Sequence, residues 1–233
     1  MHKTSLWCIP CAFFVVTCVL NLVGKGCGLP ELASTVKPAL MPLLAVTTVL
    51  YLLGGHGPVN ERSTALLVTA QLLGFAGDTL LIPNGFFYFA GGMVAFLLGH
   101  VCYMCLFGGQ SWKGLGLKQW AVAIVVMAGV TLGLVKLIGI KGAMFWPMLV
   151  YGFGLMMLIF STLAGVVRQP ADERGTWWIL LAGALLFTFS DSLIAMETFD
   201  VLPFASRPMV IMLTYLVAQS LLAIGGIRLA QRR

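Results

Sequence analysis

Two carboxyl groups stand inside apolar stretches of this sequence, where an ionisable side chain is costly. Asp78 lies in "LLGFAGDTLLI" and Asp191 lies in "LLFTFSDSLIA". A charge at the centre of a membrane-spanning helix costs about 2.5–3.5 kcal/mol on insertion scales, and such residues usually face the protein interior. Two carboxyl groups that differ in protonation state can serve as a general acid and a negative partner. Asp78 and Asp191 are therefore the first catalytic candidates.

Further polar residues interrupt neighbouring apolar stretches. His100 and Tyr103 stand three apart in "FLLGHVCY", and Tyr215 and Gln219 stand four apart in "TYLVAQ". Residues at these spacings share one face of a helix, so each pair points the same way. We expect a polar cavity with His100 near its floor, deeper than the two acids, as a third catalytic candidate. The candidates for holding substrate are Lys37, Tyr103, Tyr151, Ser190, Tyr215 and Gln219.

Each of these side chains also has an ordinary structural interpretation. A carboxyl group can pair with a neighbour, a buried histidine or tyrosine can be a packing residue, and Ser190 or Gln219 can hydrogen-bond between helices. Lys37 can extend its ammonium group from an apolar surface to the membrane interface. Glu197, Asp200 and Arg207 are expected to be solvated loop charges.

Other chemistries lack their usual signatures. The six cysteines include two C-x-x-C spacings, Cys8/Cys11 and Cys102/Cys105, but no second pair or paired-histidine motif completes a zinc pattern. No G-x-S-x-G nucleophile motif is present. Ser190 and Asp191 are adjacent on a helix and so do not face each other. We therefore expect neither a metal site nor a cofactor.

The composition predicts an integral membrane protein of the all-α class. Hydrophobic residues make up 60% of the 233 residues and charged residues only 9%, against about a quarter in typical soluble domains. The net charge of +6 is spread over short loops and forms no basic cluster. Membrane lipids, and not a nucleic acid, are thus the expected partners, while the sequence does not indicate an oligomeric state.

Eight stretches are long and apolar enough to span a bilayer, which needs about 20 residues. The connections between them are too short to separate domains, so residues 1–233 are expected to form one polytopic helical bundle. The expected helices are Leu6–Val23, Val36–Leu53, Ser63–Ile82, Phe86–Phe107, Leu117–Leu137, Ala143–Val167, Thr176–Met196 and Pro208–Ala230.

The distribution of basic residues predicts the orientation. Loops on the cytoplasmic side of a membrane carry an excess of Lys and Arg. Nine basic residues fall on the side of the two termini, against five on the other side. We expect both termini in the cytoplasm, with a bacterial inner membrane as the default location. The nine are Lys3, Arg62, Lys113, Lys118, Arg168, Arg174, Arg228, Arg232 and Arg233.

A faint internal repeat accompanies the two acids. The stretch Leu72–Ile82 aligns with Leu185–Ala195 and superposes Asp78 on Asp191. The third expected helix then matches the seventh. A shift of four helices keeps both halves in the same direction, which is a parallel 4+4 repeat.

The polar positions together resemble the YhhN-like family of integral membrane lysoplasmalogenases. The resemblance covers nearly the whole chain and combines six features in order. They are "VKPAL", "GDTLL", "FLLGHVCY", Tyr151, "GALLFTFSDSLIA" and "TYLVAQSLLAIG".

This resemblance implies an eight-helix membrane hydrolase that cleaves the vinyl-ether bond of lysoplasmalogens. The products would be a fatty aldehyde and glycerophosphocholine or glycerophosphoethanolamine. Protonation of the alkene carbon gives an oxocarbenium-like cation. Glycosidases pass through a similar oxocarbenium-like transition state and use two carboxyl groups to do so. We expect Asp78 and Asp191 to form such a pair, with His100 orienting water and Lys37 near the phosphate.

A lipid-binding or transport protein would use the same residues in a different way. A parallel bundle with intramembrane carboxyl groups can bind lipid or couple proton movement to the transport of a small solute. Transport predicts uptake without product, whereas hydrolysis predicts release of an aldehyde.

Overall fold

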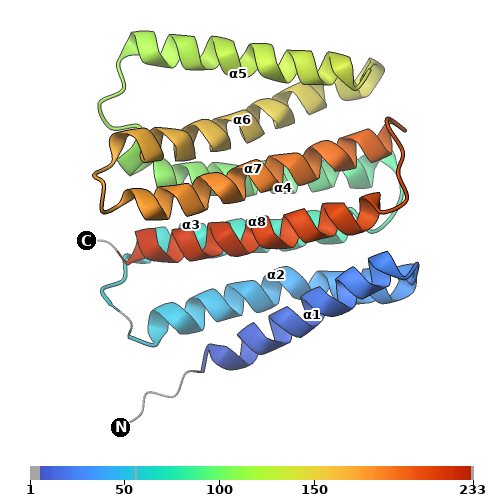
Figure 1. Ribbon diagram of the computed structural model, residues 1–233, viewed down its shortest axis with the longest axis horizontal. Helices are drawn as coiled ribbons and strands as arrows, with labels where there is room; N and C mark the ends of the chain where they lie inside the picture. Colours follow the sequence, from blue (N-terminus) through green and yellow to red (C-terminus); the bar gives the residue numbers. More distant parts are fainter. Residues whose placement is uncertain (1–5, 56, 232–233) are drawn as a thin grey trace.

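The computed structural model describes residues 6–55 and 57–231, and Figure 1 shows a bundle of helices connected by short loops. Within this described part the regular structure is entirely helical. A short 3-10 turn spans Gly142–Met144. The helices are α1 (Cys8–Gly26), α2 (Pro30–Leu53), α3 (Glu61–Leu80), α4 (Phe86–Ser111), α5 (Leu117–Leu137), α6 (Phe145–Arg168), α7 (Arg174–Thr198) and α8 (Arg207–Ala230).

The expected helical membrane bundle is confirmed. Seven of the described helices are long and apolar enough to cross a membrane. The exception is α3, which carries Glu61 and Arg62 in its first turn and Gln71 and Asp78 further along. Gln71 and Asp78 are buried, so these two polar side chains face protein and not lipid.

Local sequence signals explain where several helices begin. Pro30 opens α2 and Glu31 lies in its first turn, an arrangement that suits the unpaired N–H groups and positive end of a helix. Asn60 caps α3, because its side-chain oxygen accepts a hydrogen bond from the Ser63 N–H at 3.0 Å. Because α2 begins at Pro30, its predicted start at Val36 is six residues too late.

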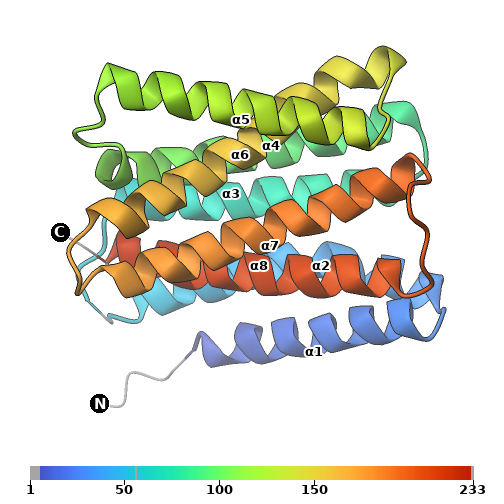
Figure 2. The same cartoon turned by 45° about the horizontal axis from the view of Figure 1, so that its top comes forward.

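Helices that follow one another along the chain run antiparallel, and Figure 2 shows the same arrangement from a second direction. The most extensive packing joins α3 to α4 and α7 to α8, while α2 packs on α3 and α6 on α7. Small residues permit this close approach. A Cβ added at Gly165 of α6 would lie 1.9 Å from the Trp177 ring of α7.

Helix α5 is the least integrated element. Among the described helices it packs against α6 alone, and it lies at the edge of the bundle in Figure 1. The contact of α2 with α3 in the first four helices thus has its counterpart in the contact of α6 with α7 in the last four. The two halves differ at the edge, because α1 packs on α2 and α8 whereas α5, within the described part of the chain, packs on α6 alone. The parallel repeat stays a prediction.

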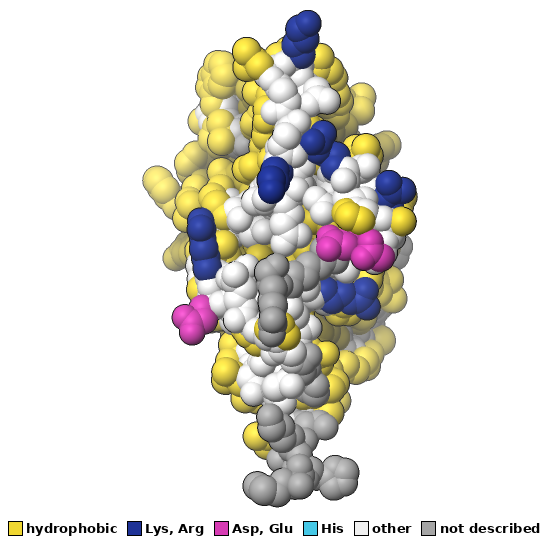
Figure 3. All heavy atoms as spheres, turned by 90° about the vertical axis from the view of Figure 1, so that its left-hand side faces the viewer, with side chains coloured by type: hydrophobic (Ala, Val, Ile, Leu, Met, Phe, Trp, Pro, Cys, Tyr) yellow, Lys and Arg dark blue, Asp and Glu magenta, His cyan; other side chains and the backbone are white. Residues whose placement is uncertain are grey.

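One end of the bundle carries both termini, and Figure 3 views the molecule from that end. Lys and Arg side chains stand out among its loops, and the flanks are mostly hydrophobic. The opposite end is built from the connections α1–α2, α3–α4, α5–α6 and α7–α8. Both Asp78 and Asp191 lie toward this opposite end of their helices.

Candidate active site

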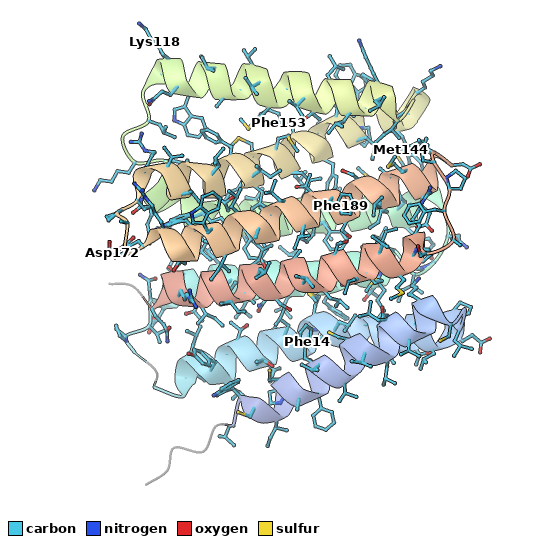
Figure 4. The ribbon with its side chains drawn as sticks, viewed as in Figure 1. Phe14, Lys118, Met144, Phe153, Asp172 and Phe189 are labelled. Carbon is cyan, nitrogen blue, oxygen red and sulfur yellow. The ribbon has the colours of Figure 1, made fainter. Side chains whose placement is uncertain are left out.

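A cavity of about 440 Å³ opens among the loops at the end of the bundle opposite the termini. Asp78 from α3 and Asp191 from α7 both line it, so residues 113 positions apart meet in one space. Tyr215 of α8 and Met144 before α6 also line it. Figure 4 labels Met144 at this end of the bundle and Lys118 and Asp172 at the other.

Asp78 is held by two partners from different helices. The residue is only 3% exposed. The Nζ atom of Lys37 on α2 lies 3.5 Å from Oδ1, and the Tyr215 hydroxyl donates a hydrogen bond to Oδ2 at 2.6 Å. A buried carboxylate with a cation and a hydrogen-bond donor has the partners it needs to stay charged.

A chain of hydrogen bonds continues from Asp78 into the bundle. The Gln219 side-chain N–H donates to the Tyr215 oxygen at 3.3 Å, and the Tyr103 hydroxyl donates to the Gln219 carbonyl oxygen at 3.2 Å. Lys37, Asp78, Tyr215, Gln219 and Tyr103 thus connect α2, α3, α8 and α4. Five of the predicted site residues form one network, which fixes the position of Asp78.

Asp191 has a different environment. It is 8% exposed, and the Tyr151 hydroxyl of α6 donates a hydrogen bond to its Oδ2 atom. Tyr151 is itself buried. Asp191 therefore faces a neutral phenol where Asp78 faces an ammonium group.

His100 lies behind a layer of aromatic rings. Its ring packs edge-on against Phe187 at 4.7 Å between centroids and lies 6.0 Å from the Tyr151 ring. Phe187 in turn contacts Tyr215 and Phe96, and both of these line the cavity. Both His100 nitrogens are buried without a hydrogen-bond partner among the described residues. His100 is thus near the acids but is separated from the cavity.

Ser190 faces the neighbouring helix. It is fully buried, and its hydroxyl donates to the Ile211 carbonyl oxygen of α8 at 2.9 Å. This hydrogen bond joins α7 to α8 directly beside Asp191.

Two charged residues that the sequence analysis left out of the site also line the cavity, Lys25 at the end of α1 and Glu197 near the end of α7. Arg207, predicted to be a solvated loop charge, is instead buried. Its guanidinium donates to the carbonyl oxygens of Val201 and Leu202 and lies 5.2 Å from the centre of the Phe204 ring. It holds the α7–α8 loop in place, a contact that sequence spacing does not reveal.

Comparison with known proteins places this geometry in context. The model of the YhhN family matches residues 32–226, which include every predicted site residue. Lysoplasmalogenase TMEM86B of Mus musculus is 31% identical over 80% of this chain and 73% of its own.

Two further relatives align over more of the chain. Lysoplasmalogenase TMEM86B of Rattus norvegicus is 30% identical over 95% of this chain and 84% of its own. Lysoplasmalogenase TMEM86A of Homo sapiens is 28% identical over 92% of this chain and 87% of its own. No solved structure gives a significant match. With the family model covering most of its length, the chain belongs to the YhhN family.

Proposed function

We propose that this protein is a membrane hydrolase that cleaves the vinyl-ether bond of lysoplasmalogens. The observation that carries the proposal is the meeting of two buried carboxyl groups with unlike partners in one cavity. The names of the three relatives reported above, each a lysoplasmalogenase, supply the substrate class.

The proposed reaction follows from the chemistry of a vinyl ether. An acid transfers a proton to the alkene carbon that is not bonded to oxygen. The alkene carbon bonded to oxygen then becomes an oxocarbenium-like cation. Water adds to that carbon and gives up a proton, forming a hemiacetal. The hemiacetal collapses to a fatty aldehyde and the free hydroxyl of the glycerophospho-alcohol. The site must supply one proton, one negative group and one water.

The different partners of the two acids support one division of these roles. Lys37 and Tyr215 stabilise the carboxylate form of Asp78, which then faces the cation and accepts the proton of the water. Among the described residues, Asp191 has the Tyr151 phenol as its hydrogen-bond partner, and we assign it as the proton donor. Tyr151 fixes the direction in which that proton points. His100 stays a positioning candidate behind Phe187.

The cavity also accommodates a charged head group. Lys25 and Lys37 both line it, and Lys37 is already paired with Asp78. Lys25 is exposed and lines the cavity, so its ammonium group is available to a phosphate. Glu197 on the same rim suits the positive amine of an ethanolamine or choline group.

The charge distribution supports an orientation with both termini in the cytoplasm. The described basic residues Arg62, Lys113, Lys118, Arg168, Arg174 and Arg228 lie at the terminal end, part of which Figure 3 shows. The cavity then opens to the non-cytoplasmic side. Location in a bacterial inner membrane stays a prediction.

Hydrolysis in D₂O tests the proposed proton transfer. Protonation of the alkene carbon places one deuterium on the carbon next to the aldehyde, and immediate borohydride reduction to the alcohol traps it. Mass spectrometry should find one carbon-bound deuterium per product molecule. Product without that deuterium would contradict acid catalysis at carbon.

A further inference from the structure

Two apolar spaces lie on the α5 side of the bundle, and the smaller one borders the reaction site. The first, about 50 Å³, lies between α5, α6 and α7 and is lined by Asp191 and Tyr151 together with apolar side chains such as Val135, Ile138 and Leu155. The second, about 570 Å³, is a groove along α5 and α6. We call it the α5–α6 groove, lined by Val122, Val126, Val130, Met156, Phe160 and Leu163 among others.

The two spaces follow one another along the same pair of helices. Met156 lines both, and Val130 of the groove is followed by Thr131 of the smaller space. From Val122 to Ile138 this path spans about 24 Å at 1.5 Å per residue. Half of a bilayer's hydrocarbon core is about 15 Å thick. The path is long enough to hold the tail of a lipid from one leaflet.

The lining is apolar even where it contains hydroxyl residues. The Thr131, Thr188 and Ser192 hydroxyls each donate to a carbonyl oxygen four residues earlier in their own helix, at 2.8, 2.9 and 2.8 Å. Each of these three hydroxyl groups thus already donates its hydrogen within its own helix. The Asp191–Tyr151 pair is therefore the polar point at the cavity end of this path, and Lys118 and Gln119 line the far end of the groove.

Asp191 stands where the polar cavity and this apolar path meet, because it lines both. In a lysoplasmalogen the vinyl ether occupies the corresponding place, between the glycerol and the hydrocarbon chain. We propose that the α5–α6 groove binds the alkenyl chain of the substrate and thereby places the vinyl ether beside Asp191. This inference rests on the proposed function.

The thin packing of α5 gives the chain a lateral route. Because α5 packs on α6 alone among the described helices, the gap between α5 and α7 is not closed by a helix contact. A lipid tail gains little free energy by moving from the bilayer into an equally apolar groove. The role of the groove is thus alignment, which affects rate through the position of the reacting bond.

A second apolar groove offers a comparison. It lies between α1, α2 and α8, has a volume of about 440 Å³ and is lined by Trp7, Phe14 and Arg228 among others. Neither acid lines this groove. A chain bound there would not bring its vinyl ether to Asp191.

Adjacent valines on α5 provide a matched pair of variants. Val126 lines the groove and is 57% exposed, whereas Val125 does not line it and is 70% exposed. In Val126→Trp the indole fills the groove, and the ratio of kcat/KM for a long-chain to a short-chain alkenyl lysolipid should fall about tenfold. Val125→Trp should keep the ratio of the unaltered protein. Equal ratios in both variants would overturn the proposal.

Photolabelling separates the groove from the reaction itself. The probe is a non-hydrolysable alkyl-ether lysolipid with a diazirine near the end of its chain, added to the purified protein. Labels should map to residues 118–130 and 156–163. Labels on α1 and α8 instead would overturn the groove assignment. Labelled groove residues in a protein that releases no aldehyde from an alkenyl lysolipid, measured in a separate assay, would support the groove and contradict the hydrolase proposal.

Discussion

At the residue scale, the two acids differ in the group that each one faces. Asp78 contacts Lys37 and Tyr215, whereas Asp191 receives a hydrogen bond from Tyr151. A general acid and a stabilising carboxylate need this kind of difference in environment. The structure thus distinguishes two carboxyl groups that look alike in the sequence.

Replacement of the proposed acid should abolish most of the activity. Asp191→Asn keeps the size of the side chain but cannot transfer a proton to carbon, so we expect kcat to fall about 10²–10⁴-fold, the usual contribution of general acid catalysis. Aldehyde release measures the effect. Asp172→Asn, a loop acid at the other end of the bundle, is the control. Near-full rates in both Asp78→Asn and Asp191→Asn would contradict the assignment.

The contributions of the Lys37–Asp78 pair to stability and to activity should be separable by mutation. Loss of one partner of a buried ion pair costs on the order of 3 kcal/mol, because the other charge is left unpaired. Lys37→Met should therefore lower the thermal unfolding midpoint in detergent. The double variant Lys37→Met/Asp78→Asn should recover most of the midpoint but remain inactive. A double variant that regains activity would show that the pair is only structural.

At the element scale, glycines set how closely α6 and α7 approach. Gly165→Ala directs a methyl group into the fully buried Trp177, and overpacking of this kind costs about 1–3 kcal/mol. We expect a lower unfolding midpoint. Gly129→Ala on α5 is the matched control, since its Cβ meets nothing within 4 Å. An equal response from the two variants would argue against close α6–α7 packing.

The helices were largely predictable from the sequence, because seven of the described helices are long and apolar enough to span a bilayer and the apolar stretches end at turns. The predicted α5, Leu117–Leu137, matches the structure. The start of α2 was wrong, and this error had a consequence. With α2 beginning at Pro30, Lys37 lies about 10 Å along the helix at 1.5 Å per residue, whereas the predicted start at Val36 puts it in the first turn.

The contacts between helices were not predictable in the same way. Periodicity shows that a residue faces the interior, but not which helix it faces. The pairing of Asp78 with Lys37 and of Asp191 with Tyr151 depends on α2–α3 and α6–α7 packing. The burial of Arg207 likewise depends on a loop in which Asp200 and Leu202 have positive φ angles of 54° and 47°.

At the scale of the whole molecule, the orientation in the membrane decides which leaflet supplies the substrate. In a background without native cysteines, Ser206→Cys and Ala171→Cys place one thiol at each end of the bundle, both at exposed positions. A membrane-impermeant maleimide added to intact cells should label Ser206→Cys at once and Ala171→Cys only after permeabilisation. The reverse pattern would invert the proposed orientation.

The central claim is that the cavity performs vinyl-ether hydrolysis. The most direct measurement compares purified protein in detergent with an alkenyl lysolipid and with its saturated alkyl-ether analogue, scoring free aldehyde. The saturated ether has no alkene carbon to protonate, so we predict aldehyde from the alkenyl lipid alone. Folded protein that releases no aldehyde from the alkenyl lipid would contradict the account and favour lipid binding or solute transport by the same acids.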